Sequence, residues 1–287
     1  MNSYVYRPAI APTGFSESQE ELKRMGHRVV TAAVDGASPA VVQAILDIAG
    51  KCGIEFLPYE IDLDGFHRYF AAADYLSRYE DYYRDNRLEK ALEHYVALKL
   101  LRLSASDVFI DIASEHSPVA EIYSRLTGSS SFSQDIMYPE GIHGGQIGGD
   151  ACSMPVPDGF ASKASLTCSF EHFEEDADQR LFRELSRVLK PGGAVCVIPF
   201  YVFVEPVTQT DPTVSVPSNV RFDPGMTIYC AEGWGNRHGR FYSPQSFVER
   251  ISNPVRDRFK FEFYHLKNAA EVDASVYARF AFVATRF

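Results

Sequence analysis

The sequence predicts an α/β protein with a doubly wound, mostly parallel sheet and helices on both faces. Residues 108–113 form a short apolar run that carries Asp111 near its end, as expected of a strand buried on both faces. Ser117-Pro118 then begins a helix that Gly128 ends. Such strand–helix pairs recur along the chain, and the carboxyl ends of parallel strands meet at one edge, where ligands bind.

Composition excludes several classes of function. The chain has 287 residues, 46% of them hydrophobic, and a formal net charge of −10 without a local run of Lys or Arg, so we expect no nucleic-acid partner. The five cysteines are scattered, which favours reduced thiols in a cytoplasmic protein over disulfides. The eight histidines lie far apart, so we expect no metal site. Residues 1–15 lack the features of a leader and no apolar run is long enough to span a bilayer, so we expect no membrane partner.

The N-terminal part predicts a small accessory segment. A valine-rich strand at 27–34, a helix and a second strand at 54–57 have the length of one βαβ-like unit. We therefore divide the chain into an accessory segment, residues 1–65, and a main domain, residues 66–287. The accessory segment is expected to pack on the main sheet or to form a contact between copies in a homo-oligomer.

Residues 66–84 are unusually aromatic, with helical spacing. An amphipathic helix that packs on the core explains this spacing, as does a helical lid over a site. Further along, two acid–histidine pairs, Glu93-His94 and Glu115-His116, are expected on the surface or at helix ends.

A weak strand at 130–134 ends at Asp135, and five glycines follow in residues 141–149. That many glycines predict a loop instead of a helix or strand. The remaining predicted elements are a strand at 163–170, a helix at 174–189, a strand at 195–204, a long loop at 205–224, a helix that begins at Ser243-Pro244, and two closing strands at 259–263 and 276–287.

Three motifs in the middle of the chain resemble a known family. They are Gly149-Asp150-Ala151, Glu171-His172-Phe173 and the run Arg-Val-Leu-Lys-Pro-Gly-Gly at 187–193. In this order they are similar to the class I S-adenosylmethionine-dependent methyltransferases, with a methyltransferase type 11-like domain over residues 88–287. The resemblance implies a Rossmann-like, seven-stranded sheet that ends in an antiparallel hairpin, and S-adenosyl-L-methionine as cofactor.

The resemblance also implies a set of cofactor-binding residues. Asp111 would pair with the cofactor's ammonium group, Asp135 would accept from the ribose hydroxyls, and Asp150 would accept from the adenine amine. The full set is Asp111, Ala113, Glu115, Asp135, Asp150, Ala151, Ser169 and Phe170. Ala113 and Glu115 stand where the family has glycines, so the glycine motif is degenerate.

Three residues are expected on the catalytic side. His172 follows a strand end, and a histidine there suits a general base, although a packing or capping role is the alternative. Arg237 and His238 lie in a glycine-rich string at 232–242 that also holds Arg240. This string is either a substrate loop whose arginines hold a carboxylate or phosphate, or a structural loop whose arginines pair with acids.

Three functions remain open on the sequence alone. The first is methyl transfer from S-adenosyl-L-methionine to a small-molecule acceptor. The second is a non-catalytic domain that kept the fold and lost the cofactor, as Ala113 and Glu115 suggest. The third is another α/β enzyme that uses the same edge of the sheet. The sequence does not name the acceptor or the atom that would be methylated.

Overall fold

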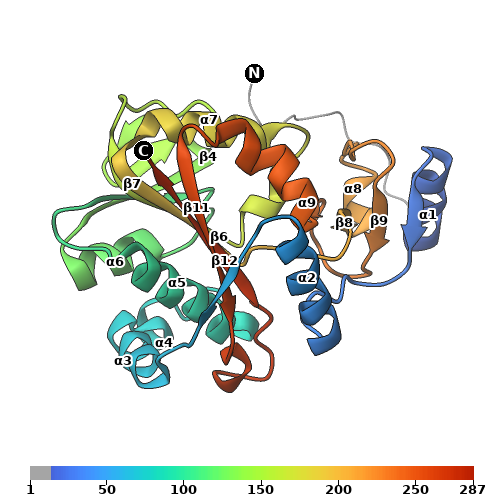
Figure 1. Ribbon diagram of the computed structural model, residues 1–287. Coiled ribbons are helices and arrows are strands. Elements are labelled where there is room, and N and C mark those ends of the chain that lie inside the picture. Colours follow the sequence, from blue (N-terminus) through green and yellow to red (C-terminus); the bar gives the residue numbers. More distant parts are fainter. Residues whose placement is uncertain (1–13) are drawn as a thin grey trace. The chain divides into compact units, whose positions relative to one another are not determined.

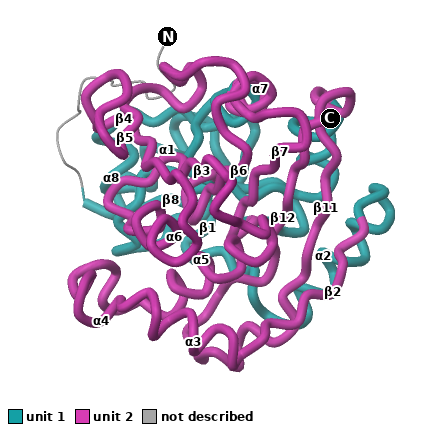
Figure 2. Tube along the Cα trace, turned by 90° about the vertical axis from the view of Figure 1, so that its left-hand side faces the viewer, with its two compact units in different colours: residues 1–54, 171–180, 201–253 teal, residues 55–170, 181–200, 254–287 magenta. Residues whose placement is uncertain are grey.

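The computed structural model describes residues 14–287, which form two compact, discontinuous units (Figure 2). Unit 1 holds described residues 14–54, 171–180 and 201–253, and unit 2 holds 55–170, 181–200 and 254–287. The prediction that residues 1–15 lack the features of a leader falls mostly on residues 1–13, which lie outside the described residues. Within residues 14–287, no helix is both long and apolar enough to cross a membrane.

The elements follow the predicted alternation (Figure 1). The helices are α1 Phe15–Arg24, α2 Pro39–Lys51, α3 Leu63–Ala73, α4 Tyr75–Arg78, α5 Arg87–Leu101, α6 Val119–Thr127, α7 Ala177–Val188, α8 Pro212–Ser215 and α9 Pro244–Phe247. Short 3-10 or π turns lie at Arg84–Asn86, Phe170–His172, Val248–Ser252, Asn253–Val255 and Ala269–Glu271. The strands are β1 Arg28–Val30, β2 Phe56–Tyr59, β3 Val108–Ile112, β4 Ser130–His143, β5 Gln146–Gly148, β6 Ala161–Thr167, β7 Leu189–Ile198, β8 Val207–Thr210, β9 Thr227–Cys230, β10 Gly239–Phe241, β11 Phe259–Leu266 and β12 Phe280–Arg286.

Unit 2 contains the predicted sheet. Its strand order in the described residues is β2-β11-β12-β7-β6-β3-β4-β5. Strand β3 pairs in parallel with β4 and β6, and β6 pairs in parallel with β7, which confirms the predicted core of the sheet. The closing strands β11 and β12 are antiparallel, also as predicted. The sheet has eight strands rather than seven, because β2 of the N-terminal segment adds to β11.

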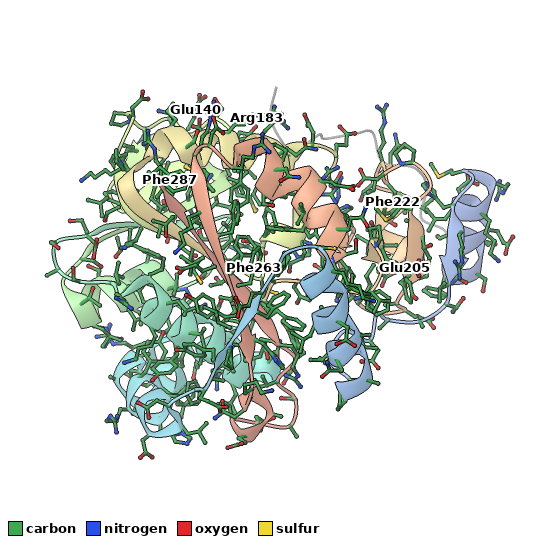
Figure 3. The ribbon with its side chains drawn as sticks, in the orientation of Figure 1. Glu140, Arg183, Glu205, Phe222, Phe263 and Phe287 are labelled. Atoms are coloured by element: carbon green, nitrogen blue, oxygen red, sulfur yellow. The ribbon has the colours of Figure 1, made fainter. Side chains whose placement is uncertain are left out.

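Both faces of this sheet are covered. Along β12, Ala281 and Val283 belong to the apolar cluster that includes residues of α5 and α6. Phe282 faces the other way, toward the rings of Phe182 in α7 at 6.2 Å and Phe263 in β11 at 5.9 Å between centroids. Figure 3 labels Phe263. Alternate residues of one strand thus reach different layers, which is why the strands of this sheet are apolar on both sides.

Helix α5 differs from its prediction. Residues 89–97 are all buried, although they include charged side chains. The expectation that Glu93 and His94 lie on the surface is wrong, since each is 0% exposed. His94 Nδ1 lies 2.7 Å from the hydroxyl of Tyr75, and burial lowers the pKa of His94 to about 3, so its ring is neutral. Residues 89–97 of this helix are therefore enclosed on all sides instead of presenting one polar face.

The glycine-rich stretch after Asp135 is not the predicted loop. Asp135 pairs in parallel with Gly148 of β5, and further along β4 Ile142 pairs with Ile147 in the opposite direction. The first part of β4, β5 and the end of β4 therefore lie side by side, with the turn at 144–145 between the last two. A side chain at Gly148 would come within 1.8 Å of the Pro139 carbonyl oxygen, so the close approach of these backbones requires glycine there.

Unit 1 holds a second, four-stranded sheet in the order β1-β9-β8-β10. Strands β1 and β2 therefore belong to different sheets, and the predicted βαβ-like unit is wrong, because its two strands do not share a sheet. The predicted loop at 205–224 contains β8 and α8, and the predicted strand at 195–204 ends at Ile198. The boundary predicted after residue 65 stays a prediction.

Candidate functional site

The switch point of the unit 2 sheet lies between β3 and β6. From β3 the chain moves outward to β4 and β5, and it then returns to β6 and β7 on the other side. The carboxyl ends of β3 and β6 are in contact, because Ser169 Oγ donates to the Ile112 carbonyl oxygen at 3.1 Å. Parallel α/β sheets bind ligands in the crevice at this position.

Asp111 lies near the carboxyl end of β3 and is fully buried. One carboxylate oxygen, Oδ1, accepts from Ser165 Oγ at 3.3 Å. The other oxygen, Oδ2, is buried and has no hydrogen-bond partner among residues 14–287. Burial raises the pKa of Asp111 to about 7, against the smaller opposing effect of Ser117 and Ser165. A buried carboxyl group with one oxygen unused suits an incoming cation.

The turn after β3 keeps the shape that a glycine motif requires. Ala113 has φ of 52° and Glu115 has φ of 48°, both in the left-handed region that favours glycine. A non-glycine residue costs about 1–2 kcal/mol in that region. The turn therefore retains its backbone conformation despite its side chains, and the degenerate motif has not changed the path of the chain.

Asp135 holds this turn from β4. Its Oδ2 accepts from the Glu115 amide at 2.7 Å, and its Oδ1 accepts from the Met137 amide at 2.9 Å. The Tyr138 hydroxyl donates to the Glu115 carbonyl oxygen at 2.6 Å. The acid predicted to contact a ribose thus also fixes the backbone of the turn.

The other predicted cofactor residues are also buried. Asp150 Oδ1 accepts from the Cys152 amide at 2.9 Å, and the neighbouring Ala151 is 5% exposed. Phe170 is 2% exposed, and its ring lies edge-on to Phe182 at 5.8 Å. Phe170 therefore packs in the aromatic core of unit 2.

Sequence reasoning missed a charged cluster beside this crevice, which we call the Cys168 cluster: Tyr83, Lys90, Glu93, Cys168 and Tyr277. Lys90 Nζ lies 3.1 Å from Glu93 Oε1 and 5.1 Å from the centroid of the Tyr83 ring. Cys168 Sγ lies 3.6 Å from the Tyr277 hydroxyl. Burial lowers the pKa of Lys90, but Cys168 and Glu93 outweigh this effect, so the pKa is well above its ordinary value. The sequence signal was a Lys and a Glu three residues apart on one helix.

The predicted catalytic residues all lie in unit 1, where they contact one another. His172 Nδ1 hydrogen bonds to the His238 carbonyl oxygen, and the His172 ring lies 6.2 Å from the Trp234 ring. His238 is 1% exposed and its Nδ1 lies 3.1 Å from the Glu171 carbonyl oxygen; burial lowers its pKa well below the ordinary value. Arg237 forms an ion pair with Glu174 at 2.7 Å. These contacts tie the 232–242 string to residues 171–174.

Arg240 belongs to a second network in unit 1, centred on Asp178, which is 0% exposed. Asp178 Oδ2 accepts from Tyr242 at 2.5 Å, from Arg250 Nε at 2.6 Å and from Arg240 Nη1 at 3.1 Å. Asp223 also accepts from Arg240, at 3.1 Å. A cavity of about 360 Å³ opens beside this network. The charges of two arginines and two aspartates neutralise one another there, so the network has the composition of a structural salt-bridge network.

Comparisons with known proteins agree with the motifs. Residues 90–197 match the family model of a methyltransferase domain. This segment runs from α5 through the switch point to β7, so it includes Asp111, the left-handed turn and Cys168. Among curated proteins, no match is found.

Solved structures of similar fold include several methyltransferases. One is the 1,6-didemethyltoxoflavin-N1-methyltransferase of Burkholderia thailandensis, with bound 1,6-didemethyltoxoflavin and S-adenosylhomocysteine: 13% identity, 80% of this chain and 93% of that chain covered, TM-score 0.45. Another is a methyltransferase of Thermotoga maritima, described as a possible histamine N-methyltransferase: 13% identity, 76% and 98% covered, TM-score 0.43. A third is a methyltransferase of Mesorhizobium loti: 14% identity, 68% and 98% covered, TM-score 0.45. Because these TM-scores are below 0.5, the assignment rests on the family model and the motifs. Residues 90–197 therefore match a methyltransferase domain, and the predicted resemblance of the chain to the class I S-adenosylmethionine-dependent methyltransferases is confirmed.

Proposed function

We propose that the chain transfers a methyl group from S-adenosyl-L-methionine to a small-molecule acceptor at the carboxyl edge of the unit 2 sheet. The observation that carries this proposal is the unpartnered oxygen of Asp111, buried beside the switch point among the described residues. The cofactor has an ammonium group, and an ammonium is the kind of donor that a buried carboxylate oxygen needs. The residues present therefore fit the cofactor that the family implies.

The predicted residues have distinct tasks in this proposal. Asp111 would hold the ammonium group, and the left-handed turn at 113–115 would present its backbone to the cofactor. Both oxygens of Asp135 already accept one backbone N–H each, and a carboxylate has about four acceptor positions, so room remains for ribose hydroxyls. Asp150 and Ala151 would bind adenine, and Ser169 and Phe170 would border the reacting carbon.

When bound, the cofactor supplies a methyl group on a positively charged sulfur, which is already a good leaving group. The chain has then mainly to hold two reactants in line and to exclude water, since proximity and orientation account for much of the rate. His172, Arg237 and His238 stay predictions for the acceptor side. Their mutual contacts in unit 1 are those expected of a structural role for Arg237 and His238.

Calorimetry with S-adenosyl-L-methionine tests the proposal. Replacing Asp111 by Ala is expected to weaken binding by about 1–3 kcal/mol, because a charge-assisted hydrogen bond is lost. Asp107 is the matched control, since it directly precedes the same strand, at its amino end, and its carboxylate accepts from Ser104 and Ser162. Asp107→Asn is expected to change the affinity by less than about twofold. Equal affinities for wild type and a folded Asp111→Ala protein would remove Asp111 from the site.

The second function is a methyltransferase-fold module that no longer binds the cofactor. Ala113 and Glu115 favour it, because glycine would let a ligand approach the turn more closely. Thermal unfolding distinguishes the two functions, since a ligand that binds the native state raises the melting temperature. If neither S-adenosyl-L-methionine nor S-adenosylhomocysteine raises it, the module is the better description.

A further inference from the structure

Gln134 of β4 lies between the two segments that the proposed function assigns to the two ends of the cofactor. On one side it pairs in parallel with Ile112, the last residue of β3 before the turn at 113–115. On the other side it pairs in parallel with Ile147 of β5, the strand that leads to Asp150. Gln134 is 1% exposed. It is therefore buried between the two segments instead of facing solvent.

The side chain of Gln134 is bound to both segments. Its Oε1 accepts from the Ala113 amide at 3.2 Å, and its Nε2 donates to the Gly149 carbonyl oxygen at 2.6 Å. A backbone N–H can only donate and a carbonyl oxygen can only accept, so the two partners fix which end of the side-chain amide faces which segment. The side chain thus connects residue 113 to residue 149 at a defined length.

The main chain of β4 also holds each segment separately. The Ser114 amide donates to the Gln134 carbonyl oxygen at 2.9 Å, and the Glu115 amide donates to Asp135 Oδ2 at 2.7 Å. The Gly149 amide donates to the Asp135 carbonyl oxygen at 3.2 Å. None of these three bonds uses the Gln134 side chain. A change of that side chain should therefore leave each segment near β4 and loosen the connection between them.

We propose that Gln134 is a positioning residue that fixes the separation between the ammonium end and the adenine end of the cofactor site. This inference rests on the proposed function, in which Asp111 holds the ammonium group and Asp150 accepts from adenine. A ligand that reaches both ends binds best when their separation already matches its length, since no binding energy is then spent on ordering the site. Gln134 acts through the backbone at 113 and 149 and not by touching the cofactor.

Calorimetry with two ligands tests this inference. S-adenosylhomocysteine carries both the ammonium group and adenine, whereas adenosine carries only the adenine end. Gln134→Met keeps the length of the side chain and removes both of its hydrogen bonds. We expect the affinity for S-adenosylhomocysteine to fall about tenfold and the affinity for adenosine to change by less than about twofold. Equal losses for both ligands would overturn the proposal, because a residue that only stabilises the fold does not distinguish them.

A second variant tests the length of the side chain. Gln134→Asn keeps the amide but is one carbon shorter, so it cannot reach the Ala113 amide and the Gly149 carbonyl oxygen together. We expect it to lower the affinity for S-adenosylhomocysteine relative to adenosine, as Gln134→Met does. If Gln134→Asn binds S-adenosylhomocysteine as tightly as wild type, the connection does not set the separation and the inference is wrong.

Gln209→Met is the matched control. Gln209 is a buried glutamine of β8 in unit 1, and its Oε1 accepts from the Val34 amide at 2.6 Å. This variant loses the same kind of hydrogen bond in the unit that holds neither Asp111 nor Asp150. We expect a lower melting temperature and an unchanged ratio of the two affinities. A ratio that falls as far as in Gln134→Met would show that it reports only lost stability, which would overturn the assignment of Gln134.

Wild type separates this inference from the proposed function. If wild type binds neither S-adenosylhomocysteine nor adenosine, the proposed function fails and the inference fails with it. If wild type binds S-adenosylhomocysteine and both Gln134 variants keep its ratio of affinities, the proposed cofactor site stands and only the role of Gln134 is wrong.

Discussion

Two buried aspartates, Asp178 in unit 1 and Asp111 in unit 2, have opposite surroundings. Each is 0% exposed. Asp178 accepts from two arginines and a tyrosine, whereas one oxygen of Asp111 accepts from the Ser165 hydroxyl. A carboxylate enclosed with cations holds a structure together, while one enclosed without a cation is costly unless a ligand brings the charge. The contrast distinguishes a structural acid from a functional one.

The largest effect should come from removing the structural acid. Asp178→Ala leaves Arg240 and Arg250 without their shared partner, and we expect a loss of about 3–5 kcal/mol in the free energy of unfolding. Urea unfolding measures it. Asp176→Ala is the matched control, because this nearby acid is 61% exposed and pairs with Arg180 at the surface, so the loss there should stay below about 1 kcal/mol. Similar losses in the free energy of unfolding at both positions would mean that the buried network stabilises the chain no more than a surface ion pair does.

A smaller effect concerns the pH dependence of stability. Because the pKa of Asp111 is about 7 in the folded chain and 3.8 ordinarily, the folded state binds the extra proton between these values. Stability should therefore be higher at acidic pH and fall as the pH rises toward 7. Relative to Asp111→Asn, which does not titrate, wild type should lose about 2–3 kcal/mol of unfolding free energy between pH 5 and pH 7. If the difference in unfolding free energy between wild type and the variant does not change with pH, Asp111 is already paired.

The smallest effect tests the strained turn beside Asp111. Ala113→Gly should raise the free energy of unfolding by up to about 1 kcal/mol, because glycine adopts the left-handed conformation more easily. Ala120→Gly is the matched control in the first turn of α6, where glycine should instead lower stability, by up to about 1 kcal/mol. Equal losses at both positions would show that the turn at 113 is not strained.

The fold was largely predictable, because the spacing of apolar residues and the residues that begin or end an element are local signals. The apolar run at 108–112, the cap Gly128 with φ of 78°, and the closing pair β11 and β12 all lie where the pattern indicates. What failed was long-range pairing. Nothing near β1 or β2 indicates that their partners are β9 and β11. Strand partners depend on tertiary context that a local pattern does not contain.

The site was only partly predictable. Asp111 was found because an acid at a strand end is a local signal, and one of its oxygens has no partner among residues 14–287. Lys90, Glu93 and Cys168 were missed, because charged residues in a helix normally predict a solvent-exposed face. Lys90 and Glu93 can be buried because each compensates the charge of the other. The sequence alone does not show such compensation.

Strand β2 has a consequence for how the chain is made. It pairs with β11, and close by the Ile61 amide donates to the Asn268 side chain, a partner 207 residues later in the sequence. During synthesis, residues 56–59 leave the ribosome long before their partner strand exists. Until the partner strand is made, their backbone groups are unpaired and their aromatic side chains are exposed. Chains in this condition can associate wrongly. Contacts of such long range also slow folding, since the loop must close before the pairing is gained. The edge of this sheet is therefore expected to be the last part of unit 2 to form.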